Sequence, residues 1–111
     1  MSVVEKALSA FTAKINKNPH GIDGFHAVYH FYLDGNDGGD YQVEFANNQA
    51  SFQKGITREA KCSLELSGTD LIQWLEGKLN PAVSIITGKM KIKGDIGLSI
   101  KLQTVLHTYQ I

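Results

Sequence analysis

The sequence of 111 residues lacks several features that mark common protein classes. Its only cysteine is Cys62, so no disulfide can form within the chain, which is typical of a reducing compartment. No apolar run approaches the ~20 residues that a membrane-spanning helix needs. The opening residues MSVVEKAL contain an acidic side chain and no long apolar core, unlike a secretory signal, and the closing residues 109–111 do not form a peroxisomal address. We therefore expect a cytoplasmic protein.

An excess of charge of either sign is also missing. Eleven Lys and Arg balance eleven Asp and Glu, and a formal net charge of zero argues against a nucleic-acid-binding protein. The charge is nevertheless divided along the chain. Residues 1–77 hold six basic and ten acidic side chains, a net charge of −4, whereas residues 78–111 hold five lysines and one aspartate, a net charge of +4. The length and ordinary composition predict a single globular domain over residues 1–111.

Patterns that carry catalysis or bind metal are absent too. The segment Asp34–Gly39 resembles the start of a calcium loop, but Gly38 and Phe45 occupy positions that need ligands, so a hairpin turn is the better interpretation. His26 and His30 lie four apart in a strand-like segment, which would separate them by roughly 13 Å and prevent a shared metal. No serine or cysteine has a nucleophile signature. We predict no metal and no cofactor, and nothing in these patterns points to an enzyme.

What the sequence does contain is a clear order of amphipathic segments. Ser2 and Glu5 have the spacing of a capping box before a helical apolar pattern. The later segments alternate between period-two and helical patterns. The predicted elements are a helix over 3–15, strands over 25–33, 41–45, 50–55 and 61–66, short helices over 70–76 and 80–87, a strand over 89–93 and a helix from Asp95 to 109. Each strand has one apolar face, which predicts an α+β fold with the helices on one side of a sheet.

The two short helices are unusually apolar for their length. Residues 71–79 include two leucines, an isoleucine, Trp74 and Leu79, and residues 82–86 are almost wholly apolar. From the pattern alone, core packing is the preferred interpretation. The alternative is that some of these side chains line an apolar pocket.

A family resemblance changes that balance. The segment CSLELSGTDLIQWLEGKLNPAVSIITGKMKIKGDIGLSIKL, residues 62–102, resembles the sterol carrier protein family of nonspecific lipid-transfer proteins. The matching pieces are a strand ending at Ser67, a helix start at Asp70, GKLNP at 77–81 and TGKMKIKGDIGLSIKL at 87–102. The resemblance implies a five-stranded, mainly antiparallel sheet with helices packed on one face, enclosing an apolar tunnel. It also implies a non-catalytic role in carrying fatty acids, acyl-CoA, sterols or phospholipids.

The resemblance implies which apolar side chains line the tunnel. They belong to the inward face of the sheet, the two short helices, the fifth strand and the last helix. These candidate lipid-binding residues are Phe31, Phe45, Leu71, Trp74, Leu75, Ile85, Ile86, Met90, Ile92, Leu98, Leu102 and Leu106.

An empty tunnel would be costly. A cavity of ~300 Å³ at ~24 cal/mol per Å³ would cost roughly 7 kcal/mol, which is comparable with the whole stability of a domain. The ligand-free protein is therefore expected to collapse partly, to retain lipid, or to form a homodimer over the opening. The chain stops soon after Tyr109 and lacks a peroxisomal ending, which is typical of a stand-alone prokaryotic member and less typical of a sterol-specific one.

Two questions stay open. The first concerns Lys89, Lys91 and Lys93, which share one face of the fifth strand. They either protect an edge strand from aggregation or contact anionic headgroups or membrane.

The second question concerns the cavity. As an alternative to lipid carriage, the fold is kept but the cavity is filled. The protein would then be an interaction or accessory module, acting as a dimer or as the partner of an enzyme that metabolises acyl chains.

Overall fold

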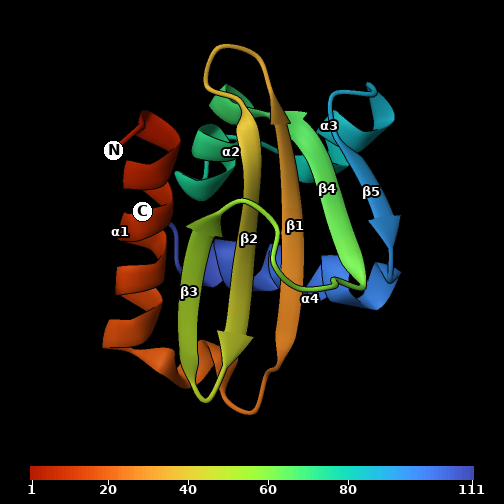
Figure 1. Cartoon of the computed structure of the whole chain (residues 1–111). Coiled ribbons are helices and arrows are strands. Elements are labelled where there is room, and N and C mark those ends of the chain that lie inside the picture. Colours follow the sequence, from red (N-terminus) through yellow and green to blue (C-terminus); the bar gives the residue numbers. More distant parts are fainter.

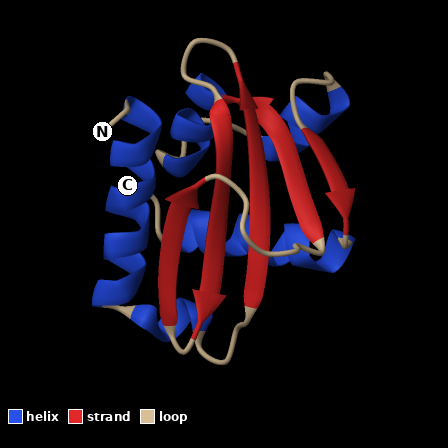
Figure 2. Ribbon diagram, viewed as in Figure 1, coloured by secondary structure: helices blue, strands red, loops and turns tan.

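A five-stranded sheet forms one layer of the molecule, most helices lie behind it, and the N-terminal helix runs along one edge (Figures 1 and 2). The computed structural model describes all residues 1–111. The elements are α1 (Val3–Lys17), the 3-10 helix η1 (Pro19–Ile22), β1 (Ala27–Asp34), β2 (Gly39–Ala46), β3 (Gln49–Lys54), β4 (Cys62–Ser67), α2 (Gly68–Leu75), α3 (Pro81–Ile86), β5 (Lys91–Gly94) and α4 (Ile96–Thr108). Every predicted helix and strand is present, and η1 is the one element that the patterns did not indicate.

The strands lie in the order β3-β2-β1-β4-β5. The β1–β2, β2–β3 and β4–β5 pairs are antiparallel, and β1–β4 is parallel, so the prediction of a mainly antiparallel sheet is confirmed. The parallel pair arises because residues 55–61 carry the chain from the end of β3 across the outer face of the sheet to the start of β4 (Figure 1).

The helices begin where the sequence predicts caps. The Ser2 side chain accepts a hydrogen bond from the Glu5 backbone N–H, and the reciprocal bond completes the capping box of α1. Asp95 Oδ1 accepts from the Leu98 backbone N–H at 3.0 Å and begins α4. Ser67 caps α2 in the same way. These bonds satisfy backbone donors that the first turn of a helix leaves free.

The hydrophobic core lies between the sheet and the helices. Inward-facing side chains alternate along the strands, and Tyr29, Phe31 and Phe45 are almost fully buried. Behind them, α1 packs on β3 and α2, α2 packs on β1 and β4, and α4 packs on β4 and β5. In contrast, α3 packs broadly against no other helix or strand, and Ser84 is its only buried residue.

The outer face of the sheet differs from the simple solvated surface that the alternation predicts. His30 and Gln42 are buried there because the connection over residues 55–61 covers them. His30 Nε2 lies 2.7 Å from the Arg58 carbonyl oxygen, and Gln42 Oε1 accepts bonds from the Thr57 and Arg58 backbone N–H groups. The polar residues of this face therefore hold the crossing connection against the sheet.

The last position of β5, Gly94, requires a residue without a Cβ. Its φ is +96°, and a Cβ at this position would overlap the carbonyl oxygen of Lys61. Gly88, after α3, also has a positive φ of +78° but nothing within 4 Å of the Cβ position. The two glycines therefore separate the conformational cost of a side chain from its steric cost.

We predict that Gly88→Ala lowers the free energy of unfolding by about 1–2 kcal/mol, the cost of left-handed backbone for an L-residue. Gly94→Ala should lower it by a further ~1–3 kcal/mol because the β4–β5 contact must open to fit the methyl group. Urea denaturation of both variants measures the difference. Equal losses of unfolding free energy in the two variants would show that the contact between Gly94 and the Lys61 carbonyl accommodates a methyl group without steric cost.

Candidate functional site

The structure divides the twelve candidate lipid-binding residues between the interior and the surface. Eight are buried with at most 5% of their surface exposed, namely Phe31, Phe45, Leu71, Trp74, Leu75, Met90, Leu102 and Leu106. Ile92 and Leu98 are half-buried. Ile85 is 41% exposed and Ile86 is 85% exposed, so these two lie outside the core. Most of the proposed tunnel wall is therefore packed interior, and the hollows that remain are open to solvent.

An apolar groove of about 570 Å³ lies between α3, β5 and the first half of α4. Five apolar side chains and four polar residues line it. The lining residues are Ile85, Met90, Ile92, Ile96, Ile100, Lys91, Lys93, Ser99 and Gln103. We call this hollow the apolar groove.

Two features of the fold keep the apolar groove open. The short helix α3 is attached mainly at its end, where the Lys89 and Met90 backbone N–H groups both donate to the Ser84 carbonyl oxygen. Nothing fills the space between α3 and α4, so Ile96 and Ile100 stay 67% and 57% exposed. Large aliphatic side chains are thus presented to water around a concave surface, which is typical of a binding site for an apolar ligand.

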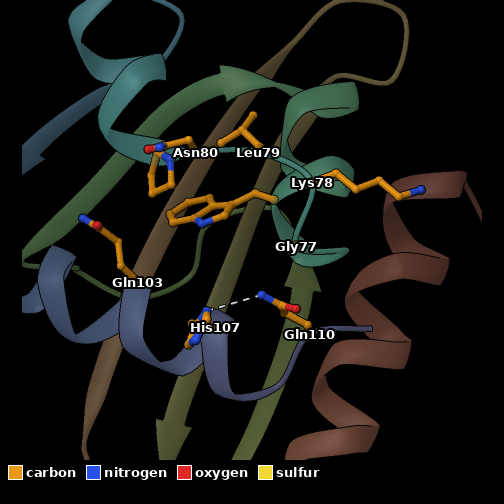
Figure 3. A pocket seen from close by; sticks show the side chains of 9 residues that line it. Gly77, Lys78, Leu79, Asn80, Gln103, His107 and Gln110 are labelled. Carbon is orange, nitrogen blue, oxygen red and sulfur yellow. Dashed lines mark hydrogen bonds between the residues drawn. The ribbon is translucent and has the colours of Figure 1, made fainter.

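A second hollow, of about 590 Å³, lies on the other side of Gln103 (Figure 3). We call it the polar pocket. Its lining residues are Trp74, Gly77, Lys78, Leu79, Asn80, Pro81, Gln103, His107 and Gln110. Figure 3 shows Gln103 and His107 from α4 on one side and Asn80 and Leu79 on the other. His107 Nδ1 lies 3.4 Å from Gln110 Nε2.

The structure therefore brings only part of the candidate set to a surface site. Ile85, Met90 and Ile92 line the apolar groove, and Trp74 lines the polar pocket. Ile86 lines neither hollow. The interior members, from Phe31 to Leu106, lie in the core beneath the helices.

Sequence reasoning missed the α4 residues that line the hollows. Ile96, Ile100, Gln103 and His107 are spaced by four, three and four positions, which places them on one helical face. The pattern Leu98, Leu102, Leu106 indicated the core-facing stripe of α4, which lies opposite to the residues that line the hollows. An apolar residue on each of two faces was the signal that could have revealed the groove.

The charged side chains around both hollows are basic. Lys78 lines the polar pocket, Lys91 and Lys93 line the apolar groove, and no Asp or Glu lines either one. Lys93 Nζ lies 2.8 Å from Glu65 Oε2, and this hydrogen-bonded pair raises the pKa of Lys93 and lowers the pKa of Glu65. Lys89 and Lys91 take part in no salt bridge. These two lysines are therefore available to an anionic partner.

The buried ionisable groups next to the groove are held neutral. The Tyr29 hydroxyl donates to the Leu98 carbonyl oxygen at 2.6 Å, and burial raises the pKa of Tyr29. Burial likewise raises the pKa of the Cys62 thiol, which is 1% exposed. Both groups therefore serve packing. No group of three or more His, Cys, Asp and Glu side chains is placed to hold a metal ion. None of the helices combines the length and the apolar character that a membrane span requires.

Residues 6–107 match the model of the SCP-2 sterol transfer family. The chain is 27% identical over 106 residues to hydroxysteroid dehydrogenase-like protein 2 of Xenopus laevis, covering 95% of this chain and 25% of that protein. It is 31% identical over 81 residues to sterol carrier protein 2 of Gallus gallus, covering 70% of this chain and 15% of that protein. The chain thus spans about a quarter or less of these curated relatives.

A solved structure supports the fold over the full chain. The solution structure of palmitated SCP2L2 from Aedes aegypti superposes with a TM-score of 0.76 at 20% identity, covering 100% of this chain and 99% of that one. At this level of identity the likeness establishes the shared sheet-and-helix architecture.

Proposed function

The chain belongs to the SCP-2 sterol transfer family, and we propose that it binds a single-chain lipid in the apolar groove and carries it without chemical change. The observation that carries the proposal is the groove itself, where Ile85, Ile96 and Ile100 face water around a concave wall. A bound acyl chain would cover these side chains. The palmitated state of the Aedes aegypti relative is in line with a fatty acyl ligand.

The size and energetics of the groove suit one acyl chain. Its volume of about 570 Å³ lies within the ~300–1,000 Å³ typical of small-molecule sites. Burying ten methylene groups contributes at most ~8 kcal/mol, which corresponds to a dissociation constant of about 1 μM. The cost of association makes the binding weaker than that. Weak binding of this kind suits a carrier, because the ligand must also be released.

Movement of α3 would allow a ligand to reach the candidate residues that are buried in the core. Met90 and Ile92 line the groove floor, and Leu71, Leu75 and Leu102 are buried in the core. Because α3 is held by few contacts, its outward movement would lengthen the groove toward this core. A long acyl chain would then contact the residues that a short chain does not reach.

A second function is favoured by the packed interior and the exposed face of α3. Val83 is 54% exposed and Ile86 is 85% exposed, and they could dock against a second copy or against an enzyme of acyl-chain metabolism. The larger relative named hydroxysteroid dehydrogenase-like protein 2 devotes about 25% of its length to the matched region. In that case the chain would act as an accessory module. The cytoplasmic location of the protein stays a prediction under either function.

We predict that Ile85→Gln and Ile100→Gln each weaken the binding of a fluorescent fatty acid about tenfold, because each places a polar amide where the acyl chain lies. Glutamine keeps helix propensity close to that of the replaced residue. Fluorescence titration measures the dissociation constants. Ile56→Gln is the matched control, since Ile56 is 39% exposed, close to the 41% of Ile85, but lies in the connection on the outer face of the sheet.

Unchanged affinity in both groove variants would contradict the proposed lipid site. Sedimentation velocity of the original protein and of an Ile86→Gln variant tests the second function. A stable homodimer that dissociates in an Ile86→Gln variant, together with no lipid binding, would favour the accessory role.

We also propose that Lys89 and Lys91 contact anionic headgroups when the groove opens onto a membrane. Both are exposed and unpaired. Lys91 lines the groove, and Lys89 directly precedes the lining residue Met90. Each basic side chain contributes ~1 kcal/mol near an anionic surface. Lys93 is less available because it pairs with Glu65. Edge protection remains the simpler role for Lys93.

The double variant Lys89→Glu with Lys91→Glu should slow transfer of a fluorescent fatty acid to vesicles containing phosphatidylserine by at least about tenfold, while leaving the affinity in solution unchanged. Added salt should reduce the difference between the variant and the original protein. Lys6→Glu with Lys54→Glu, on exposed positions of α1 and β3 at the end of the sheet opposite to β5, controls for net charge. Equal transfer rates for all three proteins would remove the membrane role from these lysines.

A further inference from the structure

We propose that the polar pocket is the head-group subsite of the same ligand, and that it takes an anionic carboxylate or phosphate head while the acyl chain lies in the apolar groove. This inference rests on the proposed lipid-binding function. It assigns a role to Trp74, Asn80 and Gln103 and defines the ligand class as an anionic single-chain amphiphile.

The two hollows follow one seam between α3 and α4. Gln103 lines both of them. On α3, Pro81 lines the polar pocket and Ile85 lines the apolar groove, and positions four apart share a helical face. On α4, His107 and Ile100 flank Gln103 on the same face. A ligand that extends along this seam passes Gln103 with its chain on one side and its head on the other.

The polar pocket holds hydrogen-bond donors that the protein itself does not use. Trp74 is only 5% exposed, and its indole N–H forms no hydrogen bond within the protein. Because no fully buried polar side-chain atom lacks a partner, this N–H is accessible to solvent, and the polar pocket is the hollow that Trp74 lines. An indole can only donate, so it selects a ligand atom that accepts.

Two side-chain amides add to this donor. Asn80 Oδ1 accepts from the Ala82 backbone N–H to cap α3, which leaves the Asn80 amide NH₂ as a free donor. In Figure 3 the Asn80 side chain lies on the α3 side of the pocket and the Gln103 side chain lies on the α4 side, with His107 below both. An oxygen-rich head that accepts several hydrogen bonds fits this set.

Charge selects an anion over a cation. No carboxylate lines either hollow, and the charged side chains present are lysines. In Figure 3 the Lys78 ammonium extends away from the pocket, where it lies 3.6 Å from Glu76 Oε1. Because the charge of Glu76 offsets that of Lys78, the preference for an anion rests on the hydrogen-bond donors and on the absence of a carboxylate in the lining. Hydrogen bonds to a charged acceptor are also stronger than those to a neutral one.

The experiment uses three probes with the same chain and different heads, namely palmitate, hexadecyl phosphate and hexadecanol. Trp74 is the only tryptophan in the chain, so quenching of its emission by acrylamide reports directly on the polar pocket. We expect palmitate or hexadecyl phosphate to bind about tenfold more tightly than hexadecanol and to protect Trp74 from acrylamide. The tighter of the two anions identifies the head as carboxylate or phosphate.

Two variants test the residues. Trp74→Phe removes the N–H and retains an aromatic ring, and Gln103→Met removes the amide at nearly constant volume. Each should weaken the anionic probes about tenfold and leave hexadecanol within about twofold. These affinities are measured by displacement of the fluorescent fatty acid, because Trp74→Phe lacks the tryptophan reporter. Gln49→Met, an exposed glutamine on β3, is the control. Thermal unfolding confirms that each variant is folded before its affinity is interpreted.

The outcomes separate this inference from the proposed function. If the anionic probes and hexadecanol bind equally and neither protects Trp74, the head-group subsite is wrong although the lipid groove stands. If Trp74→Phe and Gln103→Met weaken all three probes alike, the residues act through packing and the subsite is again wrong. If no probe binds and the Ile85→Gln variant behaves as the original protein does, the proposed lipid function itself fails.

Discussion

The contact between Gly94 and the carbonyl group of Lys61 determines where the site can form. The Asp95 backbone N–H donates to this carbonyl oxygen at 2.7 Å, and the absence of a Cβ at Gly94 allows the approach. β5 is thereby fixed beside β4, and the chain turns directly into α4, whose first turn is capped by Asp95. Because α4 starts at the free edge of β5 and runs behind the sheet (Figure 1), its first half remains uncovered on the side that faces α3.

The helix α3 has the opposite character. It is short, buries only Ser84, and is tied to the start of β5 by hydrogen bonds to one carbonyl group. Few buried contacts give a segment a low free energy of local opening. A rigid wall formed by β5 and α4 thus faces a wall that can adjust. This combination allows ligands of different length to enter without unfolding the core, which is held by α1, α2 and the sheet.

Much of the fold could be predicted because its signals are local. The alternation along β1, the Ser2–Glu5 capping box and the Asp95 cap each depend on side chains within a few positions of one another. The parallel β1–β4 pair and the burial of His30 could not be predicted in the same way. Both follow from the path of residues 55–61 over the sheet, which has no periodic pattern of its own. The candidate site was predicted only in part, since pattern alone does not separate an aliphatic side chain in the core, such as Leu102, from one in a groove, such as Ile85.

The sequence by itself determined the order of the elements, the apolar face of each strand, the caps of the helices and the family to which the chain belongs. These properties depend on residue type and short-range spacing, so they are legible without coordinates. Only the tertiary structure decided that Ile96 and Ile100 line a groove, that Trp74 faces a second hollow, and that the two meet at Gln103. The physical reason is that a hollow is the space left between elements far apart in the chain, and its position depends on how α3 and α4 are held relative to β5.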